Sequence, residues 1–179
     1  MSVLMSEFYT PTEKSRASEK AKEKGEGRKL LHELEKTGQY VFHGSSVSDL
    51  GELEIRQPFD WTEGERKEHG VPSVVATPYA DIAIFRSLVY RDYTGFGSDN
   101  QGRLYFDASQ KALDAARKSV GYVYVLERTD FSPMHGDEFE MDWRATISQQ
   151  PSKIVRVMFD DLPEEIRLIE SRPPGQVDR

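Results

Sequence analysis

Cysteine is absent from the 179 residues, which excludes disulfide bonds and any zinc site built on thiolates. Long apolar runs are also absent, because no stretch reaches the roughly 18 consecutive apolar residues that predict a membrane-spanning helix. The opening residues MSVLMSEFYT lack a charged segment followed by an apolar one, so no secretory signal peptide is expected. From these absences we expect a soluble, cytoplasmic protein that binds neither a metal nor a membrane.

An excess of basic residues is missing too. The 24 Lys and Arg residues are outnumbered by 31 Asp and Glu residues, so the formal net charge is -7. This balance excludes the broad basic surface that gives sequence-independent affinity for nucleic acid, although a nucleotide ligand remains compatible with it. The length, with 37% hydrophobic and 31% charged residues, fits one polar globular domain.

The order of sequence patterns predicts an α+β domain at 38–168 between two extensions. Residues 1–37 form a charged extension whose predicted helix docks through Leu30, Leu31 and Leu34. Beyond Gln39, the β-type runs QYVFHG, SVVATP, GYVYVLER and KIVRVMF enclose two helical segments, ADIAIFRSLVY and ASQKALDAARKSV, the second starting near Asp107 or Ser109. The segment DYTGFGSDNQGR is glycine-rich and predicts a loop, and the tail at 169–179 is expected to be disordered.

Three short stretches carry candidate functional residues, and the first is YVFHGSS. A predicted strand ends on His43, whose imidazole can donate a hydrogen bond to a ligand hydroxyl, and Gly44 lets a ligand approach the backbone closely. The structural alternative is a histidine that caps a turn.

The second stretch is VPSVVATPYADIAIF. An apolar strand ends at Ala76, Thr77 is a candidate cap, Pro78 suits the first helical turn, and Phe85 follows two turns into the helix. An aromatic ring there is able to stack on a planar ligand, but a Phe on an apolar helix face is also typical of a core.

The third stretch, GDEFEMDWRATISQQPSKIVRVMF, places the carboxylates Asp137, Glu138, Glu140 and Asp142 within six residues. In an extended chain Glu138 and Glu140 would point to one face, where two neighbouring acids would raise the pKa of one of them. An acidic turn is the alternative interpretation.

Taken together, the three stretches resemble the ADP-ribosyltransferases of the diphtheria-toxin and poly(ADP-ribose)-polymerase type. The resemblance lies in their order: a strand ending in His-Gly-Ser, a strand with Ala before a helix that carries an aromatic, and a late Glu opening a strand. It covers roughly Tyr40 to Phe159 and implies a fold of split antiparallel β-sheets with flanking helices, preceded by an N-terminal helix.

The resemblance also implies NAD as the substrate, with no metal. His43, Gly44 and Ser45 would clamp the dinucleotide, with His43 on a ribose and the Gly44 backbone on the carboxamide. Phe85 would stack on the nicotinamide, with Ala76 and Tyr79 nearby. Two acids would complete the site. Glu140 would stabilise the oxocarbenium-like charge, Glu138 would assist or orient the acceptor, and the loop would determine the choice of acceptor.

Three functions remain open on the sequence. The first is an ADP-ribosyltransferase, or its variant that uses water as the acceptor, an NAD glycohydrolase. The second is a degenerate relative that binds ADP-ribose, NAD or a protein; weak ring contacts, such as Ile82 where the family often has a Ser, would favour it over the leading transferase hypothesis. The third is an RNA 2'-phosphotransferase-like enzyme, whose chemistry needs a cluster of arginines. The acceptor and the oligomeric state are unknown.

Overall fold

The computed structural model describes residues 25–62, 65–68, 70–89, 94–134 and 139–170. It is a mixed α+β fold with several antiparallel sheets, as the sequence predicts. The elements, in chain order, are α1 (Glu26–Lys36), β1 (Tyr40–Ser45), β2 (Phe59–Thr62), β3 (Glu65–Glu68), β4 (Val74–Ala76), α2 (Ala80–Leu88), β5 (Thr94–Ser98), β6 (Leu104–Ala108), α3 (Gln110–Ala116), β7 (Gly121–Glu127), the 3-10 helix η3 (Arg128–Asp130), β8 (Ser132–Pro133), β9 (Trp143–Ala145), β10 (Lys153–Val157), η4 (Phe159–Asp161) and β11 (Arg167–Leu168).

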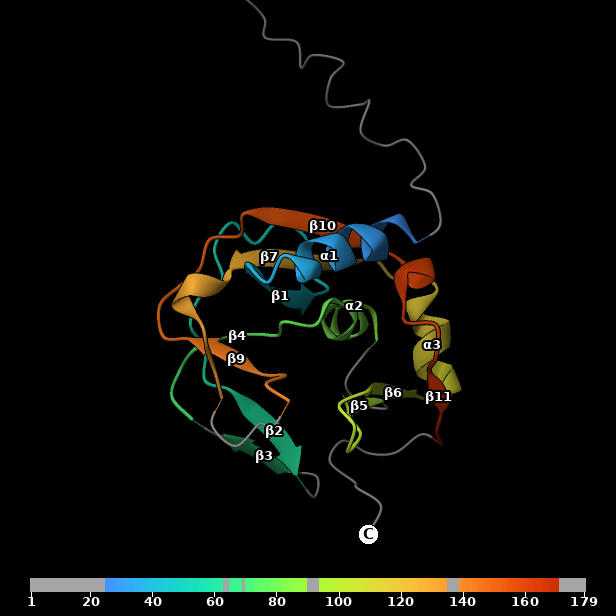
Figure 1. Cartoon of the computed structure of the whole chain (residues 1–179). Helices are drawn as coiled ribbons and strands as arrows, with labels where there is room; N and C mark the ends of the chain where they lie inside the picture. Colours follow the sequence, from blue (N-terminus) through green and yellow to red (C-terminus); the bar gives the residue numbers. More distant parts are fainter. Residues whose placement is uncertain (1–24, 63–64, 69, 90–93, 135–138, 171–179) are drawn as a thin grey trace, which may run out of the picture.

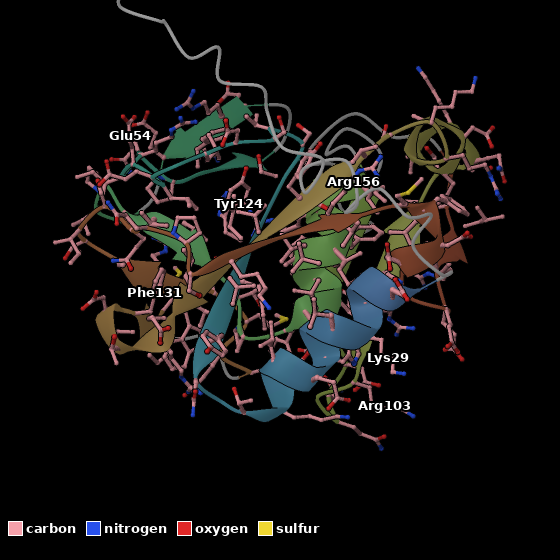
Figure 2. All side chains as sticks on the ribbon, turned by 90° about the horizontal axis from the view of Figure 1, so that it is seen from above. Lys29, Glu54, Arg103, Tyr124, Phe131 and Arg156 are labelled. Carbon is pink, nitrogen blue, oxygen red and sulfur yellow. The ribbon has the colours of Figure 1, made fainter. Side chains whose placement is uncertain are left out.

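The first sheet is antiparallel and has the strand order β1-β7-β10. Successive side chains of a strand point to opposite faces, and β1 and β7 bury side chains on both faces, whereas β10 buries only Val155 and Val157 on one. Phe42 lies opposite Val125 and belongs to the core shared with the helices, whereas Val41 lies opposite Leu126 and belongs to a second core under β4 and β9. Figure 2 shows Tyr124, from the middle of β7, in the interior, with Lys29 and Arg103 at the periphery. This sheet therefore separates two hydrophobic clusters.

The second sheet, with the order β4-β9-β8, meets the first one at a single point. Phe42 and Thr77 exchange two backbone hydrogen bonds of 2.7 and 2.9 Å, and beyond this bridge β1 and β4 form no regular ladder. In Figure 1 β1, β7 and β10 form the upper layer, while β4 and β9 lie below it. The strands of the two sheets thus diverge from the end of β4.

Helix α2 packs against β1 and β7 of the first sheet and is almost wholly buried. Its close approach to β1 depends on Gly44, because a Cβ there would collide with the carbonyl oxygen of Ala83. At the other side of the core, α3 begins where the sequence predicts, since the Ser109 hydroxyl accepts a hydrogen bond from the Ala112 N–H at 3.1 Å. These contacts fix α2 against the strand that carries His43.

Helix α1 packs on the same core through Leu31 and Leu34, whereas Leu30 is exposed. Arg28 forms a two-pronged ion pair with Asp81 on α2, at 2.8 and 2.9 Å, and His32 Nε2 lies 2.8 Å from the same carboxylate. The described end of the charged extension is therefore fixed to the first turn of α2. Residues 11–24 of the predicted helix lie outside the described residues.

The prediction of one loop at 92–103 is wrong. Residues 94–98 form β5, which pairs with β6, and Asp99 closes the turn by accepting from the Gln101 and Arg103 N–H groups. Gly97 is needed for packing within the strand, because the ring of Tyr105 occupies the space where a side chain at position 97 would lie. Residues 90–93, like most of the tail, lie outside the described residues.

Within the described residues, no helix combines the length and the apolar character that crossing a membrane requires.

Candidate functional site

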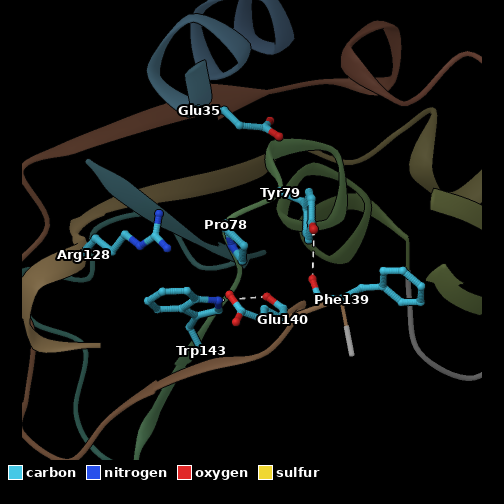
Figure 3. Close-up of a pocket in the computed structure, with 7 residues that line it drawn as sticks. All are labelled: Glu35, Pro78, Tyr79, Arg128, Phe139, Glu140 and Trp143. Carbon is cyan, nitrogen blue, oxygen red and sulfur yellow. Dashed lines mark hydrogen bonds between the residues drawn. The ribbon is translucent and has the colours of Figure 1, made fainter. Parts of the chain in front are cut away.

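A surface pocket with a volume of about 460 Å³ lies at the end of β4 (Figure 3). Segments distant in the sequence build its wall: the end of α1, the link from β4 to α2, the end of β7 and the segment that enters β9. Its lining residues are Glu35, Pro78, Tyr79, Arg128, Phe139, Glu140 and Trp143. Two of the predicted site residues, Tyr79 and Glu140, are thereby brought together.

Two hydrogen bonds fix the segment that carries Glu140. The Tyr79 hydroxyl donates to the Phe139 carbonyl at 2.9 Å, and the Trp143 indole N–H donates to the Glu140 carbonyl at 2.8 Å. Between them Glu140 has a φ of 50°, in the left-handed region that costs a non-glycine residue energy. The backbone is thus held in a specific turn, with the Glu140 side chain exposed.

This geometry corrects the prediction of an extended strand opening at Glu140. Strand β9 begins at Trp143, three residues later, so the alternation argument for Glu138 and Glu140 does not apply. Glu138 and Asp137 lie outside the described residues. The acid next to β9 is Asp142, whose carboxylate lies 4.0 Å from Arg86 and 3.9 Å from Arg144.

His43 lies at the point where the sheets diverge and does not line the pocket. Its Nδ1 is 2.7 Å from the Val75 carbonyl, which accepts only, so the proton must be on Nδ1. The ring also makes an edge contact with Tyr124 at 6.4 Å between centroids. His43 therefore ties β1 to β4 through its side chain.

The other residues of the predicted dinucleotide clamp make internal contacts. The side of Gly44 expected to admit a ligand is covered by Ala83 of α2. The Ser45 hydroxyl accepts from the Val47 N–H at 3.1 Å and shapes the following loop. Ala76 is buried and lies opposite Trp143 in the ladder between β4 and β9.

The structure does not support Phe85 as a stacking residue. Only 1% of Phe85 is exposed, and its ring contacts those of Phe96 and Phe106 at 6.4 and 5.1 Å between centroids. Neither ring face is open to a ligand in this arrangement. The aromatic residues that do line the pocket with Glu140 are Tyr79, Phe139 and Trp143.

Glu35 is a pocket residue that the sequence analysis missed. Its carboxylate accepts a hydrogen bond from the Ala80 N–H at 3.1 Å, and so caps α2 in the place predicted for Thr77. Burial raises the pKa of Glu35, and the Ala80 hydrogen bond only partly offsets this. Position 35 follows the buried Leu31 by four residues on one helix face, and this spacing was a signal that Glu35 faces inward.

Arg128 and Trp143 are two more lining residues that the sequence analysis did not single out. The Arg128 guanidinium lies 4.1 Å from the centroid of the Trp143 ring. With Glu35 and Glu140, the pocket wall carries two carboxylates and one guanidinium around aromatic surfaces. Such a mixture suits a ligand with a planar group, hydroxyls and a positive charge, and the volume is in the usual range for small-molecule sites.

Among the described residues, no group of three or more His, Asp or Glu side chains is arranged to hold a metal ion. Comparisons of the chain with protein-family models, curated proteins and solved structures found no match.

Proposed function

We propose that the protein is an NAD-dependent ADP-ribosyltransferase, or the corresponding NAD glycohydrolase. One observation carries this proposal: strand β4 and the residues after it contact both other motifs. His43 binds the Val75 carbonyl on one side, and Trp143 pairs with Ala76 while Tyr79 binds Phe139 on the other. The three stretches on which the resemblance rests, which lie far apart in the sequence from His43 to Trp143, therefore meet around one strand.

The arrangement of the sheets also supports this proposal. The resemblance implies split antiparallel sheets with flanking helices, and here two three-stranded antiparallel sheets diverge at the Phe42–Thr77 bridge, with α2 packed against the first of them. We assign the pocket at the end of β4 to the nicotinamide and its ribose.

Within the pocket, Glu140 has the chemical role of a charge stabiliser. As the bond between the ribose and nicotinamide breaks, positive charge develops on the ribose, and a carboxylate that stabilises only this charge accelerates the step. Tyr79 replaces Phe85 as the aromatic residue beside the ring. His43 acts as a positioning residue through Val75. Glu138 remains a predicted assistant whose position is not described.

Incubation with NAD, followed by chromatographic detection of free nicotinamide, tests the proposal. We expect catalytic release that is abolished by Glu140→Ala and retained by Glu52→Ala, a control at an exposed acid remote from the pocket lining. Release no faster than in buffer would reject the enzymatic function.

A second candidate function is a module that binds ADP-ribose or NAD without cleaving it. The specific observation in its favour is that Phe85 is buried and Gly44 is covered by Ala83, so two of the expected nicotinamide contacts are missing. Calorimetric titration separates the candidates: a pure binder takes up ADP-ribose and NAD with similar affinity and releases no nicotinamide.

A further inference from the structure

Helix α1 supplies a carboxylate to the pocket from outside the segment that resembles the transferase family. That segment begins near Tyr40, whereas Glu35 belongs to α1 and lines the same pocket as Glu140. Figure 3 shows Glu35 on the α1 side of the pocket and Glu140 on the opposite side, with Tyr79 beside α2. The pocket therefore has two acids that approach it from different elements.

The position of Glu35 is fixed by the docking of α1. Arg28 and His32, about two turns and one turn before Glu35, both bind Asp81 in the first turn of α2. Leu31 anchors the same helix face in the core, where it is fully buried. Glu35 itself accepts the Ala80 N–H, so only one of its two carboxylate oxygens is used by this cap. A rigid carboxylate at a pocket wall meets the requirement of preorganisation in acid–base catalysis.

Cleavage of an N-glycosidic bond by transfer needs two tasks from the protein. One group must stabilise the positive charge on the ribose, and another must accept the proton that the attacking hydroxyl or water loses. Two carboxylates that line one pocket from opposite sides can divide these tasks. The exposed Glu140 suits the first task.

We propose that Glu35 is the general base for the acceptor in this reaction, an inference that rests on the proposed function. The acceptor oxygen forms a bond to C1' of the nicotinamide ribose, and its proton passes to the Glu35 carboxylate. The C1'–N bond breaks, and its electron pair neutralises the pyridinium of the departing nicotinamide. Glu35 then returns the proton to solvent, so that NAD and water yield nicotinamide, ADP-ribose and one proton.

The electrostatic setting of Glu35 agrees with this role. Burial raises the pKa of Glu35, which makes its carboxylate a stronger base than an exposed one. The charged groups that face it are His32 on its own helix, Asp81 on α2, and Arg128 and Glu140 across the pocket. Because Glu35 must be ionised to accept a proton, turnover should fall as the pH drops through a value above the ordinary glutamate pKa.

The key variant is Glu35→Gln, assayed for ADP-ribose formation from NAD in the whole 179-residue chain. Gln keeps an oxygen that accepts the Ala80 N–H and removes a buried charge, so the fold should be retained. We expect about a hundredfold lower turnover, in the range for loss of one general base, and loss of the acidic limb of the pH profile. The matched control is Glu33→Gln, because Glu33 is exposed on the same helix and pairs with Lys36.

Azide distinguishes a base from a structural cap, because this anion attacks C1' without losing a proton. Azide should restore most of the turnover lost in Glu35→Gln and in a second variant, Glu35→Ala, measured as ADP-ribosyl azide and released nicotinamide. It should not rescue Glu140→Gln. Three results would overturn the assignment. Glu35→Gln could retain full activity, or azide could fail to restore the activity that Glu35→Gln loses. The third result is a loss of activity in Glu138→Gln, instead of Glu35→Gln, that azide restores.

The pH profile of the wild-type protein adds a measurement that needs no variant. Turnover that stays constant as the pH falls to the ordinary pKa of glutamate would also overturn the assignment of Glu35 as the base. If the wild-type protein forms no ADP-ribose, the proposed function fails and this inference fails with it. If the wild type is active and Glu35→Gln matches it, only the inference fails.

Discussion

Glu140 is held in position by hydrogen bonds to its backbone and to that of its neighbour. Its carbonyl accepts from Trp143, its neighbour Phe139 is bound by Tyr79, and its φ of 50° is stabilised by these contacts. A strained backbone with an exposed carboxylate at a pocket is typical of a functional position. This arrangement leads to a prediction for the side chain alone.

Glu140→Gln keeps the shape of the side chain and removes its charge. If Glu140 stabilises charge that appears only in the transition state, kcat for nicotinamide release should fall about a hundredfold or more, whereas the Kd for NAD should hardly change. Steady-state kinetics with calorimetric titration checks both quantities. Equal losses of kcat and affinity, or none of either, would contradict this role.

Phe85 yields a prediction about stability and not about binding. Because its ring is enclosed by Phe96 and Phe106, Phe85→Ala should lower the free energy of unfolding by about 3 to 5 kcal/mol, the range for a large cavity in a core. Urea unfolding followed by circular dichroism measures it. Phe139→Ala, at a half-exposed pocket residue, should cost clearly less. If Phe85→Ala were as stable as the wild type, Phe85 would not be a core residue and would again be a candidate ligand contact.

At the scale of elements, α1 is coupled to α2 by charge. Burial acts to raise the pKa of Asp81, but the hydrogen bonds from Arg28 and His32 outweigh it and hold the pKa below the ordinary 3.8. The interaction therefore contributes its full stability above that value and loses it as the pH falls further. Since α1 also carries Glu35, this ion pair indirectly maintains the pocket wall.

Asp81→Asn tests this coupling. At pH 7 it should lower stability by about 1 to 3 kcal/mol, because hydrogen bonds to charged groups are lost, and it should reduce the decline of the melting temperature below pH 4. Thermal unfolding between pH 3 and pH 7 provides the comparison, with Asp114→Asn on the exposed surface of α3 as the control. If the melting temperature of Asp81→Asn fell with pH as steeply as that of the wild type, carboxylates other than Asp81 would cause the loss of stability in acid.

Regular periodicity allowed some elements to be predicted from the sequence, and local exceptions prevented the prediction of others. The alternating run at Gly121–Glu127 and the apolar face of Ala80–Leu88 are where they were expected. Strand β5 was missed because its glycines resemble a loop. Its Phe96 lies opposite Phe106 and packs against the core. The turn at Glu140 was missed because a left-handed glutamate depends on tertiary contacts from Tyr79 and Trp143.

At the scale of the whole molecule, the site arises from the divergence of two sheets. His43 of the first sheet binds the Val75 carbonyl of β4 without lining the pocket, and Ala76 of β4 lies opposite Trp143, which does line it. The order of the three motifs was readable from the sequence, but the participation of Glu35 and Arg128 was not. The spacing from Leu31 indicates only that Glu35 faces inward. Which pocket Glu35 and Arg128 line depends on how α1 and the end of β7 pack around β4, and no local pattern encodes this packing.

The central claim is that NAD binds in the pocket beside Trp143, and tryptophan fluorescence tests it most directly. The chain has two Trp residues, so Trp61→Phe leaves Trp143 as the sole emitter. Stacking or close contact with the nicotinamide ring should quench its emission saturably as NAD is added up to about 1 mM, the upper end of ordinary KM values. Saturable quenching that free nicotinamide reproduces more weakly is the predicted result. Emission that stays constant over this range would contradict the account.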